Sequence, residues 1–363
     1  MTAPAFGQFF LPGPTDVHPE ILAAGQRRMI AHRGKDMTAL LTGIADPLKL
    51  LFRTERQVLV GSCSATGFME MAVRSGIRNR VLALVSGAFG ERFAAIAAAC
   101  GREVVRLDVP LGRTIEPDIL HDAIKRSDVD AVSLVHSETS TGALAPLQEL
   151  AGVVHQFDDV MLLVDAVTSL AGSPVETDAW KLDFVFTGSQ KALALPPGLA
   201  LGAASERMLR RAKTIPERGA YLDLVAFHEA FTAGQPTNTP AISLFFQLEK
   251  QLERIAAEGG VEARWARHEA MRKTCEAWVA DVGQRHGFSY LPDEGRRSWT
   301  VSCLKLPEGR NSKTITHALL AQGWTIGSGY GKLKETTIRI GHMGDHAVPA
   351  LTELLGLLER VLD

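Results

Sequence analysis

The sequence predicts an α/β protein with a mostly parallel β-sheet, and three features of its 363 residues support this. Between residues 57 and 204, short apolar runs rich in valine and leucine alternate with longer amphipathic stretches. The runs are continuously apolar, which is typical of strands buried on both faces and joined by crossover helices. After about residue 240 a long helical stretch precedes a mixture of strands and helices. We therefore expect a large α/β unit and a smaller α+β unit, packed closely because no low-complexity linker separates them.

Seven apolar segments are expected to form the strands of the large sheet, because each is short and is bounded by polar or turn-forming residues. They are residues 57–60, 81–85, 104–107, 131–135, 161–164, 184–186 and 199–203. In the smaller unit, a helical stretch over residues 241–287 is interrupted at Gly259 and Gly260. A strand at 300–304, a helix near 313–322, a strand near 336–340 and a closing helix from residue 346 should follow.

The composition excludes several classes of protein. Lysine and arginine number 39 against 41 aspartates and glutamates, so the net charge is -2 and no basic excess is available for nucleic acid. The four cysteines are scattered, so we expect reduced thiols and neither a disulfide framework nor a metal site. The N-terminal residues lack a charged leader, and no apolar run approaches the ~18 residues of a membrane span. We therefore expect a cytoplasmic protein without membrane segments.

The residues that follow each apolar run are the candidates for function, because ligands of open α/β sheets lie beyond the carboxyl ends of the strands. The first run is followed by the small-residue turn 61–67 and then by a helical stretch. Free backbone N–H groups at the start of a helix suit a phosphate, which Ser64, Ala65 and Thr66 would hold. The alternative is a tight turn in which Ser64 or Thr66 only caps the helix. Because Phe68 replaces the lysine of a P-loop and no dinucleotide fingerprint is present, we expect a single phosphate.

Two charged residues stand at the ends of other predicted strands. Asp165 follows the run at 161–164, and Lys191 follows the run at 184–186 after a short turn. Taken alone, such an aspartate is more often a turn or cap residue, and most lysines are solvated. Together with the phosphate-binding turn at residues 61–67, however, they meet the requirements of pyridoxal phosphate. These are an anchor, a partner for the ring nitrogen and an amine that holds the cofactor.

Several motifs, in the same order, resemble those of class V pyridoxal-phosphate-dependent aminotransferases, and most closely the alanine-glyoxylate and serine-pyruvate (serine-glyoxylate) branch. They are Pro12-Gly-Pro-Thr15, His136-Ser-Glu-Thr-Ser-Thr-Gly142, Val164-Asp165-Ala-Val-Thr-Ser169, Ser-Gln-Lys191-Ala with Pro196-Pro197-Gly198, and Thr337-Ile-Arg339-Ile-Gly-His-Met-Gly344. The resemblance spans nearly the whole chain. It implies fold type I of the pyridoxal-phosphate transferases. It also implies an N-terminal segment (1–20) near the active-site mouth, a large cofactor-binding domain (21–257) and a small C-terminal domain (258–363).

The resemblance also implies a role for each matching residue. Lys191 and Asp165 are the catalytic pair, with Lys191 bonded to the cofactor and Asp165 paired with the pyridine nitrogen. Phe89 lies where the related alanine-glyoxylate enzymes have a tryptophan over the cofactor ring. Arg339 would grip the substrate carboxylate, a task suited to its planar guanidinium. The remaining cofactor contacts are Ser64, Ala65, Thr66 and Gln190 at the phosphate, Thr139 at the ring oxygen and Val167 under the ring, with Gly13 beside the substrate.

One segment departs from the family pattern. The family forms homodimers in which a neighbouring subunit contributes a phosphate contact, often through tyrosine and threonine. This chain has Asn238 and Thr239 at that place, and the sequence does not decide which of the two contacts the phosphate. His32 and Arg33 near the N-terminus are either ligand contacts or a solvated helix end. We therefore expect a homodimer with shared active sites.

The expected reaction moves an amino group from a small amino acid, serine or alanine, to a small 2-oxo acid, glyoxylate or pyruvate. The matched motifs contain no second arginine for a dicarboxylic side chain, although His32 and Arg33 become candidates if the N-terminal segment covers the site. Alternatives are phosphoserine aminotransferase and a cysteine desulfurase or lyase. The last needs a reactive cysteine, whereas Cys303 lies in an apolar segment. A non-enzymatic scaffold would have no reason to retain Lys191, Asp165 and Arg339 together.

Overall fold

The computed structural model describes residues 5–363, so the first four residues of the predicted N-terminal segment lie outside the description. A large sheet of seven strands has the order β2-β10-β9-β8-β5-β3-β4. Strand β10 is antiparallel to both neighbours, and the other pairings are parallel. This confirms the predicted α/β class with a mostly parallel sheet. The strands are β2 (Val58–Gly61), β3 (Arg80–Val85), β4 (Glu103–Asp108), β5 (Ala131–Val135), β8 (Met161–Asp165), β9 (Phe184–Gly188) and β10 (Ala200–Ala204).

The order of the strands reverses beside β3, which has β4 on one side and β5 on the other. Helix α4 (Ala88–Ala99) leads from β3 to β4, and α5 (Pro117–Ser127) leads back from β4 to β5. The connection after β5 then runs to β8, away from β4, so the connections after β3 and β5 diverge and leave a crevice at the carboxyl ends of these two strands. Helix α5 shows why such segments become helical. It begins with a proline and an aspartate in its first turn, and it ends with Lys125 and Arg126.

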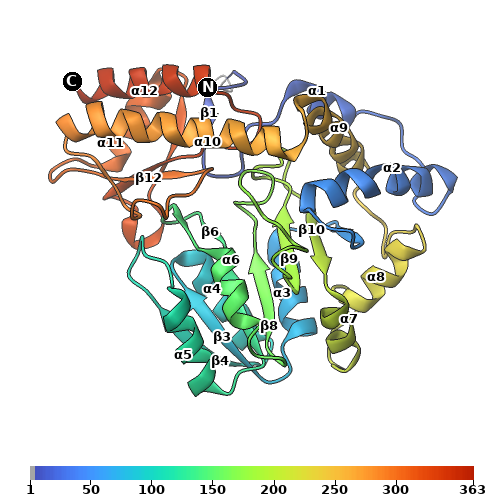
Figure 1. The fold of residues 1–363 in the computed structure, drawn as a ribbon. Coiled ribbons are helices and arrows are strands. Elements are labelled where there is room, and N and C mark those ends of the chain that lie inside the picture. Colours follow the sequence, from blue (N-terminus) through green and yellow to red (C-terminus); the bar gives the residue numbers. More distant parts are fainter. Residues whose placement is uncertain (1–4) are drawn as a thin grey trace.

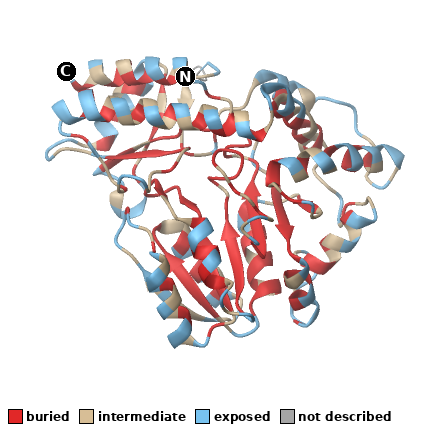
Figure 2. Cartoon of the chain, viewed as in Figure 1, coloured by how far each residue is buried: buried red, intermediate tan, exposed pale blue. Residues whose placement is uncertain are grey.

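The remaining helices of the large sheet cover its faces and flank its right side in Figure 1. They are α2 (Lys35–Phe52), α3 (Ala65–Gly76), α6 (Leu147–Val154), α7 (Glu206–Lys213) and α8 (Leu224–Thr232). Helix α1 (Pro19–Ala24) packs with α2 against α9 (Ile242–Glu258). The short hairpin β6 (Ser137–Glu138) and β7 (Ala143–Leu144) follows β5 at the crevice. Figure 2 shows buried strands between helices whose outer faces are exposed, as expected for a sheet covered on both sides.

A second sheet has the order β1-β13-β14-β12-β11 and lies at the upper left of Figure 1 with helices α10, α11 and α12. Its first strand comes from the N-terminus, where Phe9 and Phe10 pair in parallel with Thr325 and Ile326. The elements are β1 (Phe9–Phe10), α10 (Val261–Trp278), β11 (Ser289–Tyr290), β12 (Ser302–Lys305), α11 (Ser312–Ala321), β13 (Thr325–Ser328), β14 (Thr337–Ile340) and α12 (Val348–Leu362).

The predicted helical stretch over 241–287 is present and breaks where expected. Helix α9 ends at Glu258 with Gly259 as its C-cap, α10 begins after Gly260, and both glycines have positive φ. A π-helical turn, Val279–Gly283, then continues α10. Strands β1, β11 and β13 were not predicted.

Two main hydrophobic cores hold these sheets. The larger core spans the seven-stranded sheet, and the second contains Phe10 together with residues of α10, α11 and α12. Val261, Trp265 and Val301 belong to the larger core, so the cores interlock near the predicted domain boundary at residue 257. That boundary stays a prediction.

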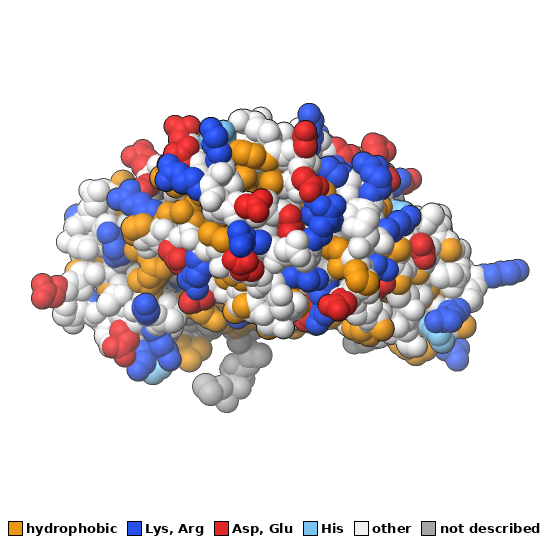
Figure 3. Space-filling model, turned by 90° about the horizontal axis from the view of Figure 1, so that it is seen from below, with side chains coloured by type: hydrophobic (Ala, Val, Ile, Leu, Met, Phe, Trp, Pro, Cys, Tyr) orange, Lys and Arg blue, Asp and Glu red, His pale blue; other side chains and the backbone are white. Residues whose placement is uncertain are grey.

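The surface seen from below in Figure 3 carries acidic and basic side chains side by side, with apolar side chains between them. This mixture agrees with the net charge of -2 and leaves no single-sign field on that face. Within residues 5–363, no helix combines the length and the apolar character needed to cross a bilayer.

Candidate active site

A pocket with about 450 Å³ of empty space lies at the carboxyl ends of β2, β3, β5, β8 and β9. The structure thus brings together nine of the residues that the sequence proposed as cofactor contacts: Ser64, Ala65, Thr66, Phe89, Thr139, Asp165, Val167, Gln190 and Lys191. Each lies at the end of a strand of the large sheet, in the segment that follows it, or at the start of the next helix. Parallel strands place their carboxyl ends at one edge, and this is why residues so distant in the sequence meet.

Lys191 is buried at the centre of this pocket, with 6% of its surface exposed. Its Nζ donates a hydrogen bond to the carbonyl oxygen of Pro12, and no carboxylate in the described part of the chain forms an ion pair with it. A Cβ at Gly13 would lie 2.5 Å from Nζ, so only glycine lets the N-terminal segment pass so close. Burial and the charge of Arg339 lower the pKa of Lys191 to about 7. The amine can therefore exchange protons near neutral pH.

Asp165 ends β8 and is 3% exposed. Its Oδ1 accepts a hydrogen bond from the Val167 backbone N–H at 2.8 Å. Burial raises the pKa of Asp165 to about 7, and the nearby Glu138 acts in the same direction. A carboxyl group in this position needs a cationic N–H donor to remain ionised.

The start of helix α3 forms one wall of the pocket. Ser64 occupies the N-cap position of the helix, but its side chain makes no capping hydrogen bond. The choice between a phosphate contact and a cap at Ser64 stays a prediction. Ala65 and Thr66 form the first turn and line the pocket. Gly67 also belongs to this turn, and its N–H donates to the Ser64 carbonyl oxygen at 2.8 Å. Helix α3 has 12 residues, and its positive end faces the space beside Lys191.

Phe89 lies in the first turn of α4, and the Nζ of Lys191 lies 5.9 Å from the centre of its ring. A fully buried carboxylate, that of Glu138, holds this turn. Its Oε2 accepts from the backbone N–H groups of Phe89 and Gly90, both at 3.1 Å, and its Oε1 accepts from Ser140 N–H at 3.0 Å. The negative charge at a helix N-terminus is favourable, and it fixes the aromatic ring above the lysine.

Arg339 projects from β14 toward the same pocket. Its Nε donates to the Ser328 carbonyl oxygen at 3.0 Å and its Nη1 to that of Thr139 at 3.1 Å. The Thr139 side chain lines the pocket and hydrogen-bonds Thr168. The guanidinium therefore sits at the rim with hydrogen-bonding capacity left over, as a carboxylate-binding group requires.

The other proposed contacts lie apart from this pocket in the single chain. Asn238 and Thr239 are exposed and line a separate, smaller hollow beside Ser62 and Tyr221. His32 and Arg33 are not among the residues that line the Lys191 pocket. Their roles stay predictions.

Five further residues line the pocket and were missed by the sequence reasoning. They are Met69, Arg92, Val135, Ser137 and Thr168. Arg92 lies one helical turn after Phe89, and its guanidinium lies 4.9 Å from the centre of that ring. Helical spacing from Phe89 was the available signal for Arg92, because residues three apart share a helix face.

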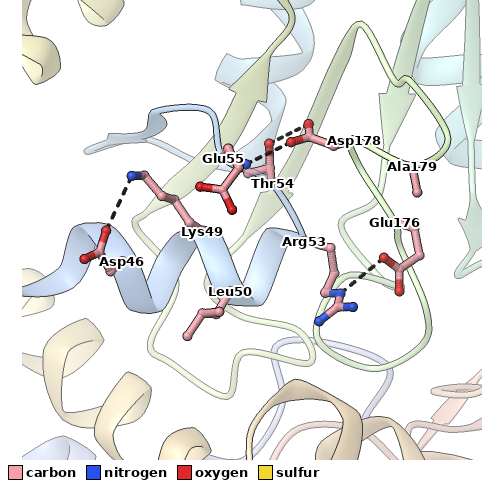
Figure 4. Close-up of a pocket in the computed structure, with 9 residues that line it drawn as sticks. All are labelled: Asp46, Lys49, Leu50, Arg53, Thr54, Glu55, Glu176, Asp178 and Ala179. Carbon is pink, nitrogen blue, oxygen red and sulfur yellow. Dashed lines mark hydrogen bonds and ion pairs between the residues drawn. The ribbon is translucent and has the colours of Figure 1, made fainter.

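A larger hollow lies elsewhere on the described part of the chain and is shown in Figure 4. It is open to solvent and lined by charged side chains that already pair with one another, such as Lys49 with Asp46 and Arg53 with Glu176. The charges of these paired side chains are already balanced, so they do not call for a charged ligand. We therefore place the candidate active site in the smaller pocket around Lys191.

Comparison with solved structures identifies the general class of the fold and pocket. The aspartate aminotransferase of subgroup IV from Thermus thermophilus is 34% identical, with a TM-score of 0.88 and 98% of each chain covered. The alanine-glyoxylate aminotransferase from Nostoc sp. is 28% identical, with a TM-score of 0.93, covering 100% of this chain and 97% of that one. The molecule is thus an aminotransferase with the fold of the pyridoxal-phosphate-dependent enzymes.

The family follows from the sequence comparisons. The family model described as Aminotransferase class-V matches residues 21–333, and the chain belongs to this family. An uncharacterised aminotransferase of Methanocaldococcus jannaschii is 38% identical over 341 residues, which cover 92% of this chain and 87% of the relative. The family that the motifs resembled is therefore confirmed.

Proposed function

We propose that this protein is a pyridoxal-phosphate-dependent transaminase that uses the Lys191 pocket to move an amino group from a small amino acid to a small 2-oxo acid. One observation carries the proposal. A buried lysine and a buried aspartate share one pocket with a helix N-terminus, and an arginine stands at the rim. No other described hollow combines these groups.

The residues present fit pyridoxal phosphate. The N-terminus of α3 offers N–H groups to the phosphate, and Phe89 and Val167 both line the space between it and Asp165. Asp165 has a pKa raised to about 7 in the protein alone, so a protonated ring nitrogen would return it to its ionised form. When bound, the cofactor supplies an aldehyde carbon that takes up the amino group and a ring that accepts electrons from the Cα–H bond.

Each pocket residue then has its own role in the reaction. Asp165 keeps the proton on the ring nitrogen, and Arg339 holds the substrate carboxylate. Lys191, whose pKa is lowered to about 7, removes the proton from the substrate Cα and returns it one carbon away. Phe89 and Thr139 keep the ring in place, and burial of the pocket excludes water from the proton transfer.

For the substrates, we propose serine or alanine as donor and glyoxylate or pyruvate as acceptor. The Nostoc relative is named for alanine and glyoxylate, which supports a small donor and a small acceptor, and Arg339 supplies one group that can bind a carboxylate. Aspartate is a second candidate donor, which a specific observation favours. Arg92 lines the pocket and forms no ion pair within residues 5–363, so it offers a second guanidinium that the matched motifs did not reveal. The Thermus relative is named for aspartate.

A cysteine desulfurase or lyase is disfavoured by the thiols. Burial raises the pKa of Cys303 to about 11, that of Cys275 to about 12 and that of Cys63 to about 11. None of these lines the Lys191 pocket. A nucleophilic cysteine needs the opposite shift.

A single-turnover panel of amino acids tests the proposed substrates. The protein is loaded with pyridoxal phosphate, mixed with each amino acid, and followed by the loss of cofactor absorbance and the appearance of the oxo acid. We expect alanine and serine to react fastest. Aspartate as the fastest donor, with that preference lost in Arg92→Gln, would move the assignment to the second candidate. Fastest conversion of glutamate or phosphoserine would overturn both.

A further inference from the structure

Tyr330 contacts the active site from the small domain, and neither the motifs nor the pocket lining singled it out. It lies two residues after β13, and the short 3-10 helix Gly331–Leu333 begins after it. The Gly329 N–H donates to the Thr337 carbonyl oxygen at 2.8 Å, and the Leu333 N–H donates to the Tyr330 carbonyl oxygen at 3.0 Å. The backbone is thus held on both sides of Tyr330, while 39% of the residue is exposed.

The Tyr330 ring lies between two groups of the site. Its centre is 5.8 Å from the centre of the Phe89 ring, at an interplanar angle of 34°. The guanidinium carbon of Arg339 lies 5.6 Å from the centre of the same ring. Phe89 in turn covers Lys191, at 5.9 Å from its Nζ. The Tyr330 ring therefore contacts both Phe89, the aromatic ring near Lys191, and Arg339 at the rim of the pocket.

A substrate bound as proposed would fill the space beside this ring. Its carboxylate lies at Arg339 and its Cα faces Lys191, which leaves the side chain as the only part without an assigned contact. The Tyr330 ring neighbours both Arg339 and Phe89, the ring near Lys191, so a side chain that extends outward between these two groups would meet it. A tyrosine ring on a fixed backbone is a stiff wall, because it has only two rotatable bonds.

We propose that Tyr330 is a specificity-determining residue that limits the size of the substrate side chain. This rests on the proposed function, because it uses Arg339 as the carboxylate site. On this proposal, the Tyr330 ring excludes large substrate side chains at the mouth of the pocket. Small donors are then selected by this exclusion as well as by favourable contacts inside the pocket. The hydroxyl group is not needed for this role, since the ring itself is the wall.

The test compares Tyr330→Ala and Tyr330→Phe with the wild type, all loaded with pyridoxal phosphate. For each, kcat/KM is measured with alanine, 2-aminobutyrate, norvaline and leucine. We expect Tyr330→Ala to raise the ratio for norvaline over alanine about 10-fold or more, because each methylene group admitted to a pocket changes discrimination by at least this order. Tyr330→Phe should leave the ratio within about twofold of the wild type, as should Leu320→Ala, which changes another exposed apolar side chain of the small domain.

A binding measurement separates this proposal from the proposed function. Dissociation constants of lactate and 2-hydroxy-4-methylpentanoate are measured by calorimetry, which needs no turnover. Selective tightening of the larger acid in Tyr330→Ala supports the wall even if no amino acid of the panel reacts, and in that case the proposed function alone fails. An equal loss for all side chains in Tyr330→Ala, in both measurements, would show that the ring only positions Arg339 and would overturn the proposal.

Discussion

Lys191 shows how a single residue acquires its chemistry from its surroundings. The side chain is buried without an anionic partner in the described chain, and both burial and Arg339 disfavour its charged form. The same conditions make the site costly for stability, since a buried ammonium group loses its hydration. The lowered pKa of Lys191 therefore suits proton transfer, and the burial that causes it lowers the stability of the folded protein.

The lowered pKa of Lys191 leads to a prediction for the cofactor-free protein. A solvent-exposed lysine has a pKa of about 10.4, whereas that of Lys191 is about 7. Because the pKa is lowered, the neutral amine appears above about pH 7, and the charged form is restored only as the pH falls below it. We expect labelling of Lys191 by acetic anhydride to reach its half-maximal rate near pH 7, as measured by mass spectrometry of its peptide. Arg339→Gln should move this midpoint upward. A midpoint close to 10 in the wild type would contradict this account of the pocket.

At the scale of one residue, the sequence identified the groups that stand next to buried strands. Lys191, Asp165 and the turn around Ser64 were predictable because a charged or small residue after an apolar run lies at a strand end. Arg92, Glu138 and Tyr330 were not identified. Arg92 could have been found from its helical spacing to Phe89, whereas Glu138 and Tyr330 act on residues from other parts of the chain. Only the packed structure brings Tyr330 to Phe89 or Glu138 to the start of α4.

At the scale of elements, all seven strands of the large sheet were predicted. For six of them, burial on both faces leaves a continuous apolar signal, whereas the edge strand β4 is only partly buried and was recognised from its valines and leucine. Strand β1 was missed for the opposite reason. It contains two residues, and its strand character arises only from pairing with Thr325 and Ile326 more than 300 residues later. Strand β13 has only four residues and includes Gly327, which packs against Pro12. Such strands are defined by their partners and not by their own composition.

The N-terminus of α4 provides a prediction about an element. A Cβ at Gly87 would lie 2.5 Å from Glu138 Cγ and from Ser140 Oγ, the two side chains that hold this helix start. We expect Gly87→Ala to lower the free energy of unfolding by about 1–3 kcal/mol, because the site has no room for a methyl group. It should also weaken the binding of pyridoxal phosphate, since Phe89 is displaced. The measurements are urea unfolding of the cofactor-free protein and a cofactor titration.

Gly152 offers a matched control for this change. It lies in helix α6, and a Cβ there would meet nothing within 4 Å. Gly152→Ala should leave cofactor binding unchanged and raise the stability by up to about 1 kcal/mol through helix propensity. If the two variants behaved alike, the close packing at Gly87 would have no energetic consequence and the account of α4 would be wrong.

At the scale of the whole molecule, we propose a homodimer that completes each active site. Asn238 and Thr239 are exposed beside Tyr221, and large apolar side chains such as Leu22 and Met29 are also exposed. Exposed apolar groups of this size are common at interfaces. Such a dimer would let Asn238 or Thr239 of one subunit contact the phosphate in the other.

Complementation between two inactive variants tests this dimer. Lys191→Ala chains are mixed with chains that carry Asn238→Ala and Thr239→Ala. In a heterodimer one site would inherit both defects and the other site neither, so about half of the wild-type activity per dimer should return. Activity that does not return in heterodimers verified by mass spectrometry, or a monomer in ultracentrifugation, would contradict the shared site.

The central claim is that Lys191 holds pyridoxal phosphate through a bond that borohydride reduces. The loaded protein is treated with sodium borohydride and digested, and the modified peptide is sequenced by mass spectrometry. We expect one pyridoxyl group per chain on Lys191, and none on any lysine after Lys191→Ala or after prior treatment with an amino donor. A label on another lysine, or an unlabelled protein that still transfers amino groups, would contradict the account.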